Sequence, residues 1–448
     1  MRVSRSRMAA YKALGEVRRR DAHAREVLRS SKELAELDGR DRALATRLVL
    51  GVQASIGMLD ARVNAHLRRG RLEPRVRDAL RLGAYELMFL DTPQSAAVSQ
   101  AVELVRLAAP RAAGLANAVL RKVAQQDVPL RNESLARVRN GNAGTGDMAL
   151  ASGYPEWLLE RLAQDRGIAA AQEIALSALE PAPIYVAPNG ARNTAEDVFR
   201  MLEEAGLHPR NEECGAIRLD APSGLAATGM VEDATVVVSD LSAQRISSMV
   251  APQKSASMLE VGQGRGTKSI LVQNAARRAG ASVRITGVDI EGFKVRVAQR
   301  RMELAGLGEC VRCYAFDALD LDKDDVPKQL SGPFDIVFVD APCSGTGTMR
   351  RHPEIPWKLD SKGIHDLSSL QLEMLKAAST RVAPSGTLHY ATCSVLRQED
   401  EQVVVAFLHS DEGAEFELAG ELFITIPTVN GPDGHFCATL RNKTLVHK

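Results

Sequence analysis

The stretch FDIVFVDAPCSGTG, at residues 334–347, carries the strongest fold signal in this chain. Its apolar run ends at Asp340, and Cys343 follows closely. A second apolar run, GTLHYATCSV at residues 386–395, places Cys393 just beyond a strand-like segment in the same way. Because the carboxyl ends of parallel strands converge on the ligand crevice of an open α/β sheet, we expect the two cysteines to be neighbours in one site.

Strand-like runs and helical periods alternate around this stretch. The strand-like runs are MLEVG, VRITGVD, CVRCYAFD, FDIVFVD and GTLHYATC, and helices are expected from Lys268, over 293–306 and over 368–382. Alternation at this spacing predicts a doubly wound parallel sheet, with the class I (Rossmann-like) α/β architecture. We place this domain at residues 236–448.

The N-terminal part has a helical period instead. From residue 7 to residue 125, apolar residues recur at intervals of three and four positions, which predicts an all-α bundle within residues 1–140. Residues 126–153 lose this period and contain NGNAGTG, which indicates a linker reaching to about residue 152. A mixed segment at 153–235, with a helix near 194–205 and the strand-like pieces PIYVA and ATVVVSD, predicts a small α+β domain.

The composition is that of a globular protein. The 448 residues are 45% apolar and 25% charged, and this length suits two or three domains. The sequence shows no apolar run of about 18 residues and no leader-type apolar segment, so we expect a soluble cytoplasmic protein that does not enter the membrane. Its six cysteines indicate free thiols. Cys310 and Cys313 form a lone CxxC, which we interpret as packing positions, and we expect no metal site.

Charge is divided unevenly along the chain. The net charge is only +1, but residues 1–140 hold 27 Lys and Arg against 15 Asp and Glu, a net of +12, which leaves −11 for the remainder. An excess confined to one domain favours contact with a polyanion such as a phosphate backbone.

A glycine-rich loop follows the first strand of the C-terminal domain. The spaced residues of this E-x-G-x-G-x-G loop are Glu260, Gly262, Gly264 and Gly266. Thr267 occupies a position where a dinucleotide-binding loop of the GxGxxG type and a Walker loop would each need glycine. This argues against both types of phosphate-binding loop. Asp289 closes the second strand, where a carboxylate can accept both hydroxyls of a ribose, and Asp317 closes the third. Together these features favour S-adenosylmethionine (AdoMet) as the ligand.

The motifs DAPCSGTG, MRRHPEIPW and YATCSV resemble those of the RNA (cytosine-5) methyltransferases, and the whole order resembles the bacterial enzymes of small-subunit (16S) rRNA. The N-terminal part, including LANAVLRK at 115–122, is similar to the NusB family of antitermination factors. The similarity covers nearly the entire chain. It implies a NusB-like RNA-binding domain, a small α+β RNA-binding segment and an AdoMet-dependent catalytic domain.

The resemblance also implies roles for individual residues. Cys393 falls on the family nucleophile, Cys343 on the cysteine that assists product release, and Asp340 on the acid that aligns the base. The implied AdoMet contacts are Glu260, Gly262, Gln263, Gly264, Arg265, Gly266, Thr267, Lys268, Asp289, Asp317 and Asp340.

The implied reaction explains why two cysteines are present. Cytosine C5 is too electron-poor to take a methyl group directly, but addition of a thiolate at C6 makes C5 nucleophilic. The implied partner is small-subunit rRNA before full assembly, bound by a monomer. Two alternatives stay open. A DNA cytosine-5 methyltransferase would use Cys343, the cysteine after proline, as nucleophile, and a non-catalytic NusB-like RNA-binding or antitermination protein would use neither cysteine.

Overall fold

The computed structural model describes residues 3–67 and 72–444, which form two compact units. One unit contains the chain up to Pro181 together with Met349–Leu359. The other contains Ala182–Thr348 and the chain from Asp360 onward. The chain therefore leaves the second unit after Thr348, contributes a short segment to the first, and returns.

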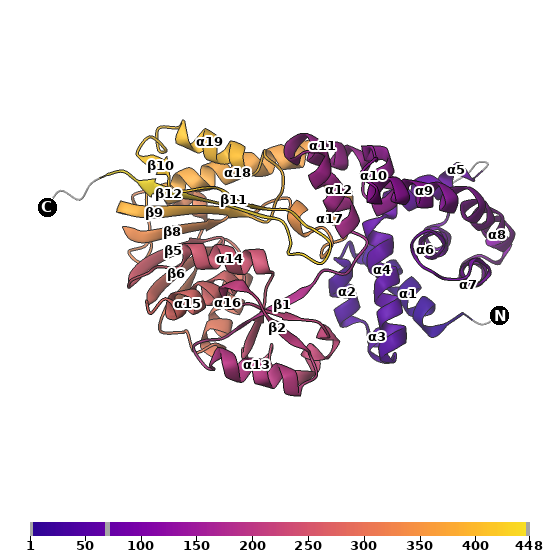
Figure 1. The fold of residues 1–448 in the computed structure, drawn as a ribbon, viewed down its shortest axis with the longest axis horizontal. Coiled ribbons are helices and arrows are strands. Elements are labelled where there is room, and N and C mark those ends of the chain that lie inside the picture. The colour runs from indigo at the N-terminus through magenta and orange to yellow at the C-terminus, as the bar shows by residue number, and fades with distance from the viewer. Residues whose placement is uncertain (1–2, 68–71, 445–448) are drawn as a thin grey trace. The chain divides into compact units, whose positions relative to one another are not determined.

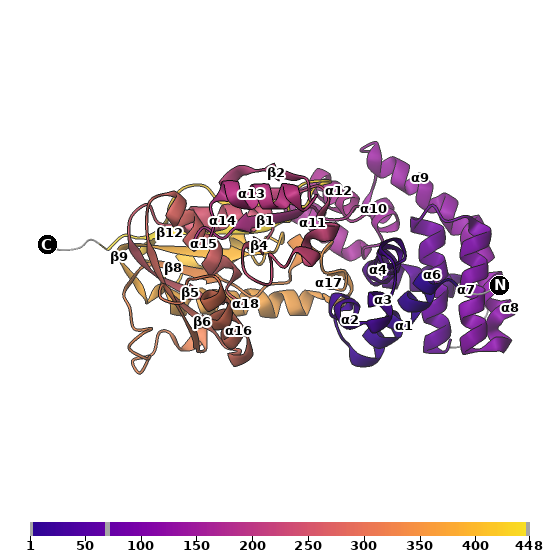
Figure 2. The ribbon, with the colours of Figure 1, turned by 90° about the horizontal axis from the view of Figure 1, so that it is seen from below.

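The first unit is helical, as the period predicts. Its helices are α1 (Arg5–Arg20), α2 (Ala24–Ser30), α3 (Lys32–Ala35), α4 (Gly39–Ala54), α5 (Ile56–Ala65), α6 (Pro74–Phe89), α7 (Gln94–Ala108), α8 (Ala113–Lys122), α9 (Val128–Arg139), α10 (Thr145–Ser152), α11 (Glu156–Arg166), α12 (Ile168–Ser177) and α17 (Ile355–Lys358). Helices α6, α7 and α8 run side by side (Figure 2). Leu80, Leu104 and Leu120, one from each of these helices, are fully or almost fully buried and anchor the core.

The prediction of a linker over residues 126–153 is wrong. This stretch forms α9 and α10, with a turn between them at 140–144. Helix α9 carries only a narrow apolar face, so tertiary contacts hold it where periodicity gives little signal. The guanidinium of Arg131 lies 4.0 Å from the ring centre of Phe89 and donates to the carbonyl of Ala151 at 3.0 Å.

The segment Met349–Leu359 is built into the helical unit. The indole of Trp357 donates to the carbonyl of Ala54 at 2.7 Å. A Cβ on Gly57 would lie 2.1 Å from the Trp357 ring, so only glycine leaves room for the indole there. The buried carboxylate of Glu354 accepts from the main-chain N–H of Ala24 at the start of α2.

The second unit begins with a small antiparallel sheet in the order β2-β3-β1-β4. Its strands are β1 (Ile184–Pro188), β2 (Pro209–Asn211), β3 (Ile217–Leu219) and β4 (Val236–Val238). Helix α13 (Ala195–Glu204), capped by Thr194, packs Val198 and Leu202 on this sheet (Figures 1 and 2). The helix and strands expected within 153–235 are therefore confirmed.

The large sheet has the order β10-β12-β9-β8-β5-β6-β7, with β11 paired to β12. Its strands are β5 (Ala256–Val261), β6 (Val283–Asp289), β7 (Val311–Ala315), β8 (Phe334–Asp340), β9 (Val382–Thr392), β10 (Phe416–Leu418), β11 (Phe423–Thr425) and β12 (His435–Asn442). Strands β5 to β9 are parallel as predicted. The sheet is nevertheless mixed, because β12 pairs antiparallel with β9 and with the short β10 and β11.

Helices cover the two faces of the large sheet (Figure 1). They are α14 (Leu241–Val250), α15 (Thr267–Arg278) and α16 (Gly292–Leu304) on one face, and α18 (Ser361–Ser379) and α19 (Glu401–Leu408) on the other. Along β8 the buried side chains alternate: Phe338 faces the first layer of helices and Val337 the second. A strand buried on both faces explains the continuous apolar run that marks it in the sequence.

Within the described residues, no single helix is long and apolar enough to cross a membrane. The pair α4 and α5, bent by 77°, passes that test of length and composition together. Leu48, Val52 and Leu59 of this pair are fully buried in the core of the helical unit.

Candidate active site

The two cysteines come together at the carboxyl edge of the large sheet. Asp340 at the end of β8 is paired in register with Ala391 near the end of β9, so the chain segments after both strands leave the sheet side by side. The sulfur atoms of Cys343 and Cys393 lie 3.2 Å apart. The main-chain N–H of Cys393 also donates to the sulfur of Cys343 at 3.3 Å. The expectation that they are neighbours is confirmed.

The two thiols are electrostatically different. The hydrogen bond from the Cys343 thiol lowers the pKa of Cys393, and the nearby Lys268 ammonium adds to this, while burial and the carboxylates of Asp340 and Glu399 oppose it. The same hydrogen bond, together with burial, raises the pKa of Cys343 well above its ordinary value. Of the two cysteines, Cys393 therefore forms a thiolate more readily, with Cys343 as the hydrogen-bond donor to it.

Lys268 and Asp340 form an ion pair beside the cysteines. The Lys268 ammonium lies 2.6 Å from a carboxylate oxygen of Asp340. Burial disfavours the charge on Lys268, but attraction to Asp340 outweighs this, and the pKa of Lys268 is raised. A fixed positive charge thus lies close to the Cys393 sulfur.

The glycine-rich loop connects β5 to α15 next to this pair. Gly262 has φ +77°. A Cβ added to it would lie 2.2 Å from the carbonyl oxygen of Asp340, so a side chain is excluded there. Gly266 has φ +75° and lies against the end of the Met302 side chain. The loop therefore passes close to the end of β8, at a distance that glycine permits and a side chain would not.

Asp289 is the last residue of β6, and Asp317 follows the neighbouring strand β7. One oxygen of Asp289 accepts from the N–H of Gly264 at 3.0 Å, and the other accepts from the N–H of Glu291 at 2.9 Å. Asp317 caps the turn that follows β7 by accepting from the N–H of Leu319 at 3.0 Å. Each Asp289 oxygen keeps a free lone pair for a further hydrogen bond.

The remaining residues of the loop range from fully buried to exposed. Glu260 is fully buried and accepts from the hydroxyl of Ser269, and desolvation raises its pKa to about 7. Oε1 of Glu260 and Oε1 of Gln263 have no hydrogen-bond partner in the described part of the chain. Arg265 is exposed, and the Thr267 hydroxyl accepts from Arg301 at 2.9 Å.

Cys310 lies just before β7, and Cys313 lies on this strand. Cys310 and Cys313 pack against the apolar core under α16, as interpreted from the sequence, and burial raises the pKa of Cys313 to about 11. His389 lies on β9 and its pKa is lowered by burial to about 4. Over residues 3–67 and 72–444, no group of three or more His, Cys, Asp or Glu side chains could hold a metal ion.

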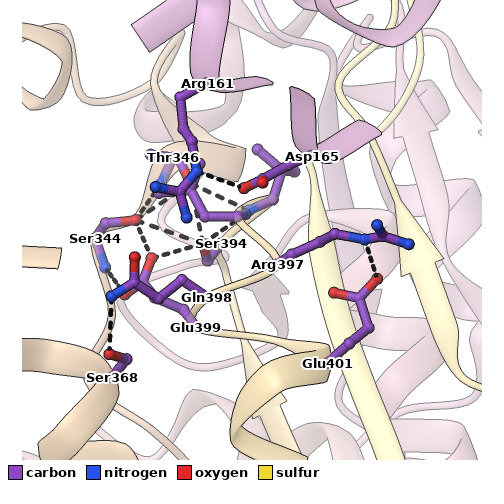
Figure 3. Close-up of polar contacts among 12 residues, drawn as sticks. Arg161, Asp165, Ser344, Thr346, Ser368, Ser394, Arg397, Gln398, Glu399 and Glu401 are labelled. Carbon is purple, nitrogen blue, oxygen red and sulfur yellow. Dashed lines mark hydrogen bonds and ion pairs between the residues drawn. The ribbon is translucent and has the colours of Figure 1, made fainter. Parts of the chain in front are cut away.

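Sequence reasoning missed a cluster of buried polar groups beneath the cysteines. Glu399, fully buried, accepts from the hydroxyls of Ser344 and Ser394 (Figure 3). The signal was present in the sequence, because each cysteine is followed directly by a serine, as Cys343-Ser344 and Cys393-Ser394.

Comparison with known proteins gives consistent matches along the chain. Residues 4–125 match the NusB family, residues 154–226 the Methyltr_RsmF/B-like, ferredoxin-like domain, and residues 247–441 the family described as 16S rRNA methyltransferase RsmB/F. The ribosomal RNA small subunit methyltransferase B of Salmonella newport (strain SL254) is 30% identical over 388 residues, which cover 85% of each chain.

Two solved structures share the fold. The crystal structure of PH0851 matches with a TM-score of 0.75 at 20% identity, covering 98% of this chain and 99% of that one. NSun6 from Pyrococcus horikoshii, solved with SFG, matches with a TM-score of 0.53 at 16% identity, covering 65% of this chain and 98% of that one.

Fold, site and matches together define a methyltransferase with a Rossmann-like domain joined to a NusB-like helical domain and a ferredoxin-like segment. The chain belongs to the 16S rRNA methyltransferase RsmB/F family.

Proposed function

We propose that this protein transfers a methyl group from AdoMet to C5 of a cytosine in 16S rRNA, through a covalent adduct between Cys393 and C6 of the base. One observation carries the proposal: the Cys393 sulfur lies 3.2 Å from Cys343 and has a lowered pKa. Both cysteines follow the ends of adjacent parallel strands, next to the glycine-rich loop.

The residues around the loop fit an AdoMet-type cofactor. Gly262, Gly264 and Gly266 present backbone rather than side chains, and Asp289 has lone pairs free for ribose hydroxyls. Ile290, 67% exposed, offers apolar surface beside Asp289. Asp317, which follows β7, would contact the adenine side of the cofactor. When bound there, AdoMet supplies an electrophilic methyl group. The other loop residues named from the sequence contribute by shaping this turn.

Cys393 acts as the nucleophile. Its thiolate adds to C6, and the electron pair of the C5–C6 bond becomes available at C5, which takes the methyl group. A base then removes the C5 proton, the double bond re-forms, and the carbon–sulfur bond breaks to release the thiolate. A thiol with a lowered pKa serves both steps, because it is the better source of thiolate and the better leaving group.

Cys343 assists the last step. Its raised pKa keeps its proton in place, and the hydrogen bond to the Cys393 sulfur stabilises negative charge on that atom. The same bond stabilises the thiolate as it leaves C6. Asp340, at the end of β8, accepts from the cytosine amine and aligns the base, while Lys268 holds its carboxylate in one orientation.

The substrate is rRNA of the small subunit before assembly is complete, bound by a monomer in the cytoplasm. The net charge of +12 over residues 1–140 favours phosphate contacts by the helical unit.

Tritium transfer from labelled AdoMet into 16S rRNA, followed by bisulfite sequencing of rRNA from a deletion strain, tests this function. We expect label in rRNA and one protected cytosine that disappears in the deletion strain. Label entering DNA instead would support the DNA-methyltransferase alternative, and no transfer to either would favour a non-catalytic RNA-binding protein.

A further inference from the structure

Glu399 is a buried acid with every acceptor position filled. Its side chain is fully buried in the described structure. One oxygen accepts from the N–H of Ser344 at 2.7 Å and from the amide of Gln371 at 3.0 Å. The other accepts from the hydroxyls of Ser344 and Ser394, the latter at 2.7 Å. Four donors around the two oxygens match the four acceptor positions of a carboxylate.

These donors belong to the two segments that carry the cysteines. Ser344 follows Cys343, and Ser394 follows Cys393, so one carboxylate joins both segments (Figure 3). Thr346 reinforces the link, because its hydroxyl lies 3.1 Å from that of Ser394 and accepts from the N–H of Val395 at 3.1 Å.

Residues of the core also fix the position of Glu399. The hydroxyl of Tyr390 on β9 donates to the main-chain carbonyl of Glu399. Gln371 on α18 also donates to the carbonyl of Pro342 at 2.9 Å. Glu399 is therefore attached to the sheet, to a covering helix and to both cysteine segments.

Two observations exclude a direct chemical role for Glu399. It has no lone pair left to take a proton from a substrate, and its burial leaves no path for one. Its negative charge also raises the pKa of both cysteines, which opposes thiolate formation. An acid that disfavours the reactive state of its neighbours must contribute through structure.

We propose that Glu399 is a positioning residue that fixes the Cys343 and Cys393 segments relative to each other, so that the two sulfurs stay in contact during the reaction. The inference rests on the proposed cysteine chemistry. It accounts for a serine after each cysteine, because each serine supplies a donor to the same carboxylate. Holding reacting groups in place has a large effect on rate, since a misplacement of about 1 Å costs about 100-fold.

Three variants test the proposal. Glu399→Ala removes all four contacts. Glu399→Gln keeps the shape and two acceptor contacts, and its amide can donate to the serine hydroxyls, which are free to rotate. Asp335→Asn is the control, because Asp335 accepts from the N–H and the hydroxyl of Ser257 in the same pattern, at the opposite end of β8.

The first readout is methyl transfer to rRNA. We expect Glu399→Ala to lower kcat by about 100-fold, Glu399→Gln by about 10-fold or less, and Asp335→Asn not at all. The KM for rRNA and the dissociation constant of AdoMet should change less than about 3-fold, because neither binding surface is altered. A loss of AdoMet binding that parallels the loss of kcat would overturn the proposal, since Glu399 would then hold the domain as a whole.

The second readout does not depend on methylation. Phenylarsine oxide forms two arsenic–sulfur bonds with a pair of adjacent thiols, and its oxygen leaves as water with the two thiol protons. Cys343→Ala serves as the reference for a protein without this thiol pair, and its loss of affinity for phenylarsine oxide shows how much of the binding depends on the pair. We expect Glu399→Ala to lose at least 10-fold in affinity for phenylarsine oxide, with Glu399→Gln and Asp335→Asn close to the unmodified protein. Unchanged arsenical binding and unchanged kcat in Glu399→Ala would refute the positioning role. If Glu399→Ala loses affinity for phenylarsine oxide as expected, but neither the unmodified protein nor any variant methylates RNA, the proposed function fails and the positioning role stands.

Discussion

The sulfur atoms of Cys343 and Cys393 lie 3.2 Å apart, and the hydrogen bond between them makes the largest contribution to the lowered pKa of Cys393. The same contact raises the pKa of Cys343, so the pKa values of the two thiols shift in opposite directions.

Removing Cys343 should raise the pKa of Cys393, because the thiolate loses its hydrogen-bond donor while Asp340 and Glu399 still repel it. Lys268 remains as the one favourable charge facing it from the described structure. The rate of Cys393 alkylation by iodoacetamide, followed against pH by mass spectrometry, should have its midpoint at higher pH in Cys343→Ala. Cys214→Ala, in the small α+β part, is the control. A midpoint that stays in place in Cys343→Ala would mean that the contact does not set the reactivity of Cys393.

Asp289→Ala should weaken AdoMet binding by about 1.5–3 kcal/mol, the usual value for a hydrogen bond to a charged group. The ribose loses its acceptor, and the glycine-rich loop also loses the contact from Gly264. Calorimetry measures the change. Glu291→Ala is a matched control, because this acid lies two residues further along and pairs with Lys294. An unaltered dissociation constant in Asp289→Ala would remove this residue from the cofactor site.

Trp357→Ala should destabilise the helical unit by about 3 kcal/mol, because the indole fills space against Gly57 and bonds to Ala54. Both tryptophans of the chain lie in this unit, so the fluorescence of Trp157 reports its unfolding in guanidinium. Lys358→Ala, at an exposed neighbour, should change the stability by less than about 0.5 kcal/mol. Equal midpoints for the two variants would show that the 349–359 segment does not stabilise the unit.

Replacing Arg121 and Lys122 by glutamine should weaken rRNA binding and flatten its salt dependence. Both are exposed basic residues in the last turn of α8, within the part of the chain that carries the +12 excess. Each lost phosphate contact lowers the slope of log affinity against log salt by about 0.7 for single-stranded RNA. Filter binding across a salt series measures this, with Arg312→Gln in the second unit as control. If the slope is identical in all three proteins, α8 does not contact the phosphates.

The sequence allows the parallel strands, the helical bundle and the pairing of the cysteines to be predicted, because each depends on a strong local signal. The antiparallel strands β10, β11 and β12 were missed. Strands β10 and β11 have three residues each and are recognisable only by their pairing with β12. Helix α9 was missed because contacts such as that of Arg131 with Phe89, rather than periodicity, hold it in place.

The role of Glu399 could not be predicted for a similar reason. Residues 398–401 read as a charged surface turn, QEDE, and nothing in that pattern indicates burial. The fold buries Glu399 next to both cysteine segments, where its carboxylate accepts hydrogen bonds from Ser344 and Ser394.

The division of labour between the cysteines is tested most directly by comparing Cys393→Ala with Cys343→Ala on rRNA in the presence of AdoMet, using a denaturing gel that retains covalent protein–RNA species. Cys393→Ala should form no adduct and transfer no methyl group, because addition to C6 never begins. Cys343→Ala should attack and methylate but release slowly, so that a slow-migrating covalent complex accumulates. A trapped adduct in Cys393→Ala and none in Cys343→Ala would make Cys343 the nucleophile and contradict the mechanism proposed here.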